Sequence, residues 1–233
     1  MFSMFKMYCY KMFRQKSLYV IWIIMLLFIN IQTVSASFAQ YSADFGAFYL
    51  IFASLFPVIF FSSDISSGFI KNYAGSVSHK NTIITARSAM IVVQNILTLA
   101  VMFIGLCVVT FFRGTDSGDF GFILKYYICT FLAGLACSFI SMMFTELTRK
   151  TVPAVILTVA IGTGVISQLF GNISLLISNG SFNISNFMVT GIINQLGIDS
   201  ANGDFYKLIL IAVCYIVISA FISIFSIEKR DVV

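Results

Sequence analysis

Long apolar segments alternate with short polar ones along the whole chain. The apolar segments lie at residues 18–34, 45–61, 88–112, 122–147, 152–170 and 205–227. Each has about the length of ~20 residues that an α-helix needs to cross the hydrocarbon core of a membrane. The pattern therefore predicts an all-α integral membrane protein with six transmembrane helices.

The composition points to the same class. Of the 233 residues, 59% are hydrophobic and only 10% are charged, whereas a soluble domain has about 45–50% apolar and about 25% charged residues. Too few polar residues are present to cover a soluble globule, so we expect residues 1–233 to form a single transmembrane domain. The net charge of +5 is typical of the loops of a membrane protein and does not indicate a nucleic-acid partner.

Residues 1–16, before the first apolar segment, have a helical periodicity. At about 100° per residue, Lys6, Lys11 and Arg14 fall on one side of a helix. The apolar residues fall on the other side, namely Phe2, Phe5, Tyr8, Cys9, Met12 and Phe13. This distribution predicts an amphipathic helix on the membrane surface, with its cations near anionic headgroups. The alternative is a basic tail beside the first span.

The cations are distributed unequally over the two sides of a six-span protein. Eleven fall on the side of the termini, namely Lys6, Lys11, Arg14, Lys16, Lys71, Lys80, Arg87, Arg149, Lys150, Lys229 and Arg230. Only three fall on the other side, namely Arg113, Lys125 and Lys207. Because Lys and Arg accumulate in cytoplasmic loops, the bias predicts a multi-pass protein of the plasma membrane with both termini in the cytoplasm. Residues 171–204 are then external, and their mixed polarity predicts a re-entrant segment before the last span.

Few polar residues lie within the predicted spans. Gln94, Asn95 and Gln168 favour hydrogen bonds between helices over contacts with a substrate. Asp64 and Glu146 lie near span ends, where a charge costs less, and no acid or base stands out at the membrane centre. This argues against an ion-coupled carrier, which usually needs such a charge. Small residues in the fourth span suit close packing against this chain or a partner, namely Ala133, Gly134, Ala136, Cys137 and Ser138.

No catalytic or cofactor-binding pattern is present in the sequence. His79 is the only histidine, and the five cysteines form no CxxC pair, so neither a metal site nor a catalytic dyad is indicated. The dipeptide Gly-Lys does not occur, which excludes the phosphate-binding loop of a P-loop ATPase. We therefore expect that the chain is not an enzyme by itself and binds no cofactor.

The polar segment at residues 62–87 carries the most informative pattern. It contains Asp64, Gly68, Ile70, Lys71, Asn72, Ser78, His79, Lys80, Ile83, Ile84 and Arg87. Their order resembles the loop between the second and third spans of permease subunits of type-2 ABC exporters. Asp64 and His79 depart from that pattern, because glutamate and arginine are more common at their places. The six spans, the N-terminal helix and the external segment also fit this family.

The resemblance implies that residues 62–87 form a cytoplasmic coupling loop seated on a separate ATPase subunit. That subunit, in two copies, would bind the ATP and Mg²⁺. Gly68 would allow close approach of the backbone, and Lys71, His79 and Lys80 would pair with acids of the ATPase. A second permease, identical or related, is also implied, so that two permeases form a dimer.

The size of the chain resembles that of small permeases for bacteriocin immunity and peptide export. The expected substrate is therefore a hydrophobic or amphipathic peptide, or a similar toxic compound, moved out of the cell. Two other classes remain open. One is a scaffold that recruits a cytoplasmic partner without transport, and the other is a secondary carrier or channel.

Overall fold

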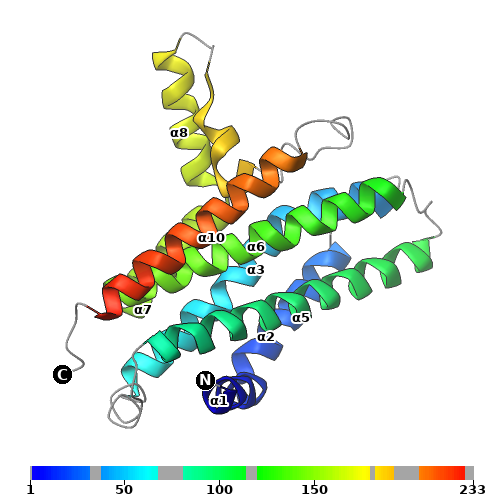
Figure 1. Ribbon diagram of the computed structural model, residues 1–233. Helices are drawn as coiled ribbons and strands as arrows, with labels where there is room; N and C mark the ends of the chain where they lie inside the picture. Colours follow the sequence, from blue (N-terminus) through cyan, green and yellow to red (C-terminus); the bar gives the residue numbers. More distant parts are fainter. Residues whose placement is uncertain are drawn as a thin grey trace.

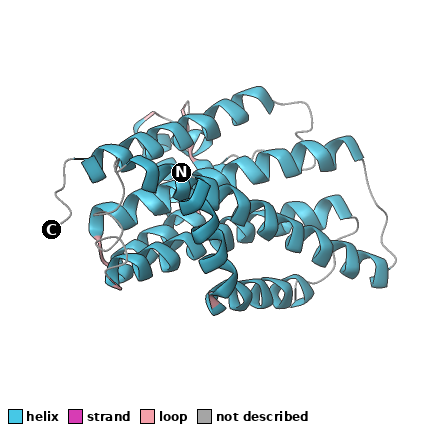
Figure 2. Cartoon of the chain, turned by 60° about the horizontal axis from the view of Figure 1, so that its bottom comes forward, coloured by secondary structure: helices cyan, strands magenta, loops and turns pink. Residues whose placement is uncertain are grey.

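The computed structural model describes residues 2–31, 38–67, 81–113, 120–178, 182–191 and 205–228. These residues are almost entirely helical and contain no strand, as Figure 2 shows. The predicted all-α class is therefore confirmed. Helices suit a hydrocarbon environment because each N–H and C=O group finds its partner within the same segment.

Four helices are long and apolar enough to cross a membrane. The elements are α1 (Phe2–Arg14), α2 (Lys16–Ile31), α3 (Phe38–Ser66), α5 (Asn81–Arg113), α6 (Phe120–Thr148), α7 (Thr151–Gly162), α8 (Val165–Ile177), the 3-10 helix η1 (Ile184–Phe187) and α10 (Phe205–Glu228). The candidate spans within them are Phe48–Ser66, Thr82–Phe112, Ile123–Thr148 and Phe205–Ser226. The second, third, fourth and sixth predicted spans thus have long helical counterparts.

Two further helix pairs reach a membrane-crossing length only if each bent pair counts as one span. The helices α1 and α2 meet at 57°, and α7 and α8 meet at 58°. The described residues therefore hold four to six candidate spans. The fifth apolar segment, predicted as one helix over residues 152–170, is broken between α7 and α8.

Gly164 accounts for the break between α7 and α8. Its φ of 74° lies in the left-handed region, which glycine adopts far more readily than other residues. Beyond it, α8 stands away from the long helices (Figure 1). The apolar pattern did not reveal this break because apolar residues continue on both sides, and a glycine is common inside membrane helices.

The helix α8 continues into the segment at residues 171–204 that was predicted to be external and re-entrant. Residues 171–177 are helical, and the bent pair α7 and α8 is either a broken span or a re-entrant segment. The helix buries the small residues Ser167, Gly171 and Ser174 and leaves large apolar residues such as Phe170 and Leu176 exposed. This is the reverse of a soluble amphipathic helix and suits contact with lipid. Residues 179–181 and 192–204 lie outside the described part of the chain.

The predicted coupling loop at residues 62–87 is shorter than the polar pattern indicated. The helix α3 continues to Ser66, and α5 begins at Asn81, so both ends of this segment are helical. Polar side chains are compatible with these helix ends because they bond to nearby carbonyls. Ser66 Oγ, for example, donates to Ser63 O at 3.2 Å. Residues 68–80 between the two helices lie outside the described residues.

The helix α6 lies at the centre of the bundle. Its span is 72% buried, whereas that of α10 is 28% buried, and α6 packs against α3, α5, α7 and α10. In Figure 1 the ends of α3 and α6 and the beginning of α5 all point toward the lower left. The long helices therefore alternate in direction, as consecutive spans of one chain do.

The small residues of α6 pack within this chain. All five residues from Ala133 to Ser138 named above are buried, which settles the alternative left open by the sequence. At Gly134 a Cβ atom would lie 2.5 Å from Tyr49 Cε1 of α3. The Tyr49 ring cannot move aside easily, because its hydroxyl donates to Asn95 Oδ1 at 3.2 Å. Glycine thus permits the close approach of α3 and α6.

We predict that Gly134→Ala destabilises the protein by about 1–3 kcal/mol, the usual effect of overpacking a core. Gly105→Ala is the matched control, because a methyl group there would meet the flexible end of Leu26 at 2.7 Å. Alanine raises helix propensity by about 1 kcal/mol at both sites, so the difference between the variants isolates the clash. Thermal unfolding in detergent measures it, and equal midpoints would contradict the prediction.

Candidate functional site

Four charged side chains from four helices meet inside the bundle. Lys11 of α1, Asp64 of α3, Arg87 of α5 and Glu146 of α6 form this charge cluster. Asp64 and Arg87 are fully buried, and Glu146 is 6% exposed. Because an isolated ion in such surroundings is very unfavourable, the four side chains are expected to act as one paired unit.

The pairing in the charge cluster runs in a chain. Lys11 Nζ pairs with Asp64 Oδ1, and Arg87 Nη1 pairs with Glu146 Oε1. The two pairs approach each other through Arg87 Nη2 and Asp64 Oδ2, which are 3.7 Å apart. Arg87 Nε also donates to the hydroxyl of Tyr8 at 3.3 Å. The guanidinium thereby connects α1, α3 and α6 to α5.

Aromatic rings enclose the two cations. The Cζ atom of Arg87 lies 4.7 Å from the ring centre of Phe61 and 5.9 Å from that of Tyr8. Lys11 Nζ lies 5.4 Å from the ring centre of Phe60. A cation over an aromatic face is attracted by the ring, more strongly when it is desolvated. The rings therefore supply part of the stabilisation that water would otherwise give.

The helix α1 is held by this cluster in a way that the sequence did not predict. Met4, Tyr8 and Met12 are buried, and α1 packs on α5. Phe13, expected on the apolar face, is 46% exposed, and Lys11, expected near headgroups, pairs with Asp64 instead. The predicted helix is present, but its buried face packs against other helices of the protein and not against lipid.

From the sequence, we also expected the charges of Asp64 and Glu146 to have a low free-energy cost because they lie near span ends, and this expectation is wrong. Both lie near helix ends, yet both are buried and need cationic partners. A signal for this was available in α5: Ile83, Arg87, Met90 and Ile91 share one helical stripe at spacings of three and four, and all are buried. An arginine inside an apolar stripe needs an acid on another helix. The sequence alone could not identify that acid.

A second, uncharged polar network lies deeper in the bundle. Asn95 Nδ2 donates to Ser138 Oγ at 2.9 Å, and Gln94 Nε2 donates to the carbonyl of Ala53 at 3.3 Å. Trp22 Nε1 donates to Thr98 Oγ1 at 3.1 Å, and that hydroxyl also accepts from Gln94. These bonds join α2, α3, α5 and α6. Gln94 and Asn95 are fully buried and serve helix packing.

Of the remaining predicted site residues, the structure describes only Gln168, which belongs to neither network. Gln168 is exposed on α8. Seven residues of the predicted coupling loop lie outside the described residues, namely Gly68, Ile70, Lys71, Asn72, Ser78, His79 and Lys80. Of the predicted loop, the structure therefore brings together Asp64 and Arg87, and it adds Lys11, Tyr8 and Glu146.

The four to six apolar candidate spans are those of a multi-pass membrane protein. Within the described residues, no group of three or more His, Cys, Asp or Glu side chains is placed to hold a metal ion. Among known protein families none matches the chain, and no curated protein matches it. The resemblance of residues 62–87 to ABC exporter permeases therefore remains an expectation.

We predict that Arg87→Met destabilises the protein by about 3–5 kcal/mol, because Glu146 is then left as an unpaired buried charge. The double variant Arg87→Met/Glu146→Leu should lose less than the single variant. It removes one charge of each sign and leaves Lys11 paired with Asp64. Unfolding midpoints in detergent test this, with Arg14→Met on the exposed side of α1 as the control. Additive losses in the double variant would contradict a paired unit.

Proposed function

We propose that the chain is the membrane subunit of an ATP-driven exporter whose energy comes from a separate ATPase. The substrate would be a hydrophobic or amphipathic peptide or toxic compound, as in bacteriocin immunity. The order of residues between α3 and α5 supports this class, and the absence of a P-loop pattern requires a second polypeptide.

One observation carries the proposal: the charge cluster holds both ends of the segment between α3 and α5. Asp64 lies in the last turn of α3, and Arg87 lies near the start of α5. Both are tied to α1 and α6 through Lys11 and Glu146. A force on residues 68–80 would therefore reach four helices at once. This is the mechanical property that a coupling segment needs for rigid-body switching.

In this proposal residues 68–80 face the cytoplasm and contact the ATPase. The excess of cations at this end of the bundle supports that orientation. ATP-driven closure of two ATPase copies would move the segment and tilt the helices held by the cluster. A second permease would complete the pathway, since one chain supplies only one half of it.

The test is co-expression and reconstitution of this chain with ABC ATPase subunits from the same genome. The two chains should copurify, and ATP hydrolysis in vesicles should rise when a membrane-active peptide is added. Export of a fluorescent peptide should require both chains and ATP. A scaffold would copurify without export, and absence of any complex would contradict the proposal.

Lys11→Met provides a sharper test of coupling. The Lys11 side chain is 30% exposed, so water can replace part of its pairing, and Arg87 stays 3.7 Å from Asp64. The loss of stability should therefore be smaller than for Arg87→Met, and the unfolding midpoint checks this before transport is measured. We expect the complex to hydrolyse ATP but to lose most of its peptide export. Lys6→Met, on the exposed side of the same helix, should behave as the unchanged protein. Equal export by both variants would show that α1 does not transmit the movement.

A proton-coupled carrier is the second candidate, and the buried acids favour it more than the sequence did. Asp64 and Glu146 are shielded acids on different helices, a feature of proton relays. The distinguishing measurement is peptide flux into vesicles with a pH gradient and no ATP. Flux that is abolished by Glu146→Gln, in folded protein, would favour the carrier over the exporter.

A further inference from the structure

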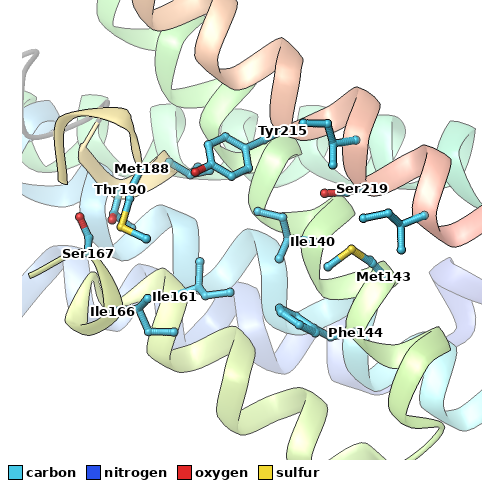
Figure 3. A pocket seen from close by; sticks show the side chains of 13 residues that line it. Ile140, Met143, Phe144, Ile161, Ile166, Ser167, Met188, Thr190, Tyr215 and Ser219 are labelled. Atoms are coloured by element: carbon cyan, nitrogen blue, oxygen red, sulfur yellow. The ribbon is translucent and has the colours of Figure 1, made fainter. Parts of the chain in front are cut away.

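A cavity of about 310 Å³ lies between the helices that surround the bend of α7 and α8. Its walls come from α6, α7, α8 and α10 and from residues 188–190. Figure 3 shows Ile140, Phe144, Ile161 and Ile166 around the open space. The cavity is separate from the charge cluster and shares no residue with it.

The bend at Gly164 lies at the wall of this cavity, because Ile161 before it and Ile166 after it both line the space. The helix α7 packs against α6, whereas α8 turns away from α7 at 58°. Residues 188–190 return to the bend, where Thr190 Oγ1 would lie 3.7 Å from a Cβ atom at Gly164. The break therefore leaves space on one side of α6 and places a hydroxyl at its border.

Three hydroxyl groups of the cavity wall differ from most buried hydroxyls of the bundle because they lack a hydrogen-bond partner among the described residues. Ser167, Thr190 and Ser219 are 5%, 7% and 2% exposed, and none of their hydroxyls bonds to another described residue. Most other buried serines bond to a carbonyl of the preceding turn; Ser223 Oγ of α10, for example, donates to Ser219 O at 2.8 Å. Ser62, outside the cavity, is an exception. In Figure 3 Ser167 and Thr190 lie at one end of the cavity and Ser219 lies beside Tyr215 at another.

The chemistry of the wall selects the ligand. No charged residue is among the described residues that line the cavity, so an ion would be bound without compensation, which is very unfavourable. The apolar wall favours a hydrocarbon chain, while unpaired hydroxyls favour a ligand with its own donor and acceptor groups. A group the size of water takes roughly 30 Å³, so the space holds about ten methylene-sized groups.

We infer that this cavity binds the polar end and the adjacent part of the chain of a neutral single-chain amphiphile such as a monoacylglycerol, roughly ten non-hydrogen groups in all, while the rest of the chain extends out of the cavity. The acyl chain lies along Ile140, Phe144 and Ile161, and the hydroxyl or ester groups bond to Ser167 and Thr190. The inference concerns binding alone and does not rest on the proposed exporter function. A failure of ATP-driven export would leave it intact.

The test uses a monoacylglycerol that carries a photoreactive diazirine in its chain, with the full-length protein in phosphatidylcholine vesicles. After illumination, mass spectrometry should locate the label on cavity residues such as Ile140 and Ile161. An excess of unlabelled monoacylglycerol should abolish this label, whereas equal extra phosphatidylcholine should not. A label spread evenly over outward-facing residues, and displaced by phosphatidylcholine, would overturn the inference.

Two variants test separately how the hydroxyl groups and the volume of the cavity contribute to binding. Thr190→Val removes a hydroxyl at nearly constant volume and should weaken monoacylglycerol binding by about 3–10-fold, the value of one hydrogen bond. A diazirine-bearing alkane should label Thr190→Val as well as the unchanged protein. Equal loss for both probes would overturn the role of the hydroxyl.

Ser219→Trp should fill the cavity and abolish labelling of its walls by either probe. Val217→Trp, two residues away and 59% exposed on α10, is the matched control and should retain the label. Both variants must elute as single species with unfolding midpoints near that of the unchanged protein. Persistent labelling in a folded Ser219→Trp variant would overturn the inference, and Thr190→Val keeps it falsifiable if that variant does not fold.

Discussion

The need to neutralise one buried guanidinium organises one end of this protein. Arg87 is inaccessible to water and lies in a helix that faces apolar neighbours. It therefore draws an acid from α6, a second acid from α3 and a hydroxyl from α1 to a single point. The position of α1 follows from this requirement, because Tyr8 and Lys11 complete the set. Packing alone would not fix four helices with the same specificity, since apolar contacts have little directionality.

The bundle thus has two kinds of connection with different properties. At the charge cluster, ion pairs join helix ends and would be costly to break one at a time. Deeper inside, Gln94 and Asn95 make several weaker bonds to neighbouring helices. On the far side of α6, the bend at Gly164 leaves α8 outside both networks. The protein therefore has one part in which ion pairs and hydrogen bonds join the helices, and a second, more open part around the cavity.

The sequence predicted the helical class and the main spans because long apolar segments admit few other structures in a membrane. It did not predict the bend at Gly164, where hydropathy continues without change across the break. It placed Asp64 and Arg87 in a functional segment but assigned them to a cytoplasmic coupling loop, whereas both lie in helices and are buried. Charge pairing between distant segments depends on which helices are neighbours, and nothing in the sequence of α5 indicates that Glu146 of α6 lies beside Arg87.

The charge cluster holds two cations and two anions, so it carries no net charge. Moving one elementary charge through a membrane potential of 100 mV takes about 2.3 kcal/mol, but a neutral group that shifts as a whole takes almost none. A displacement of the charge cluster as a whole therefore takes almost no electrical work, and these four side chains would contribute no voltage sensitivity to a movement of the helices they join.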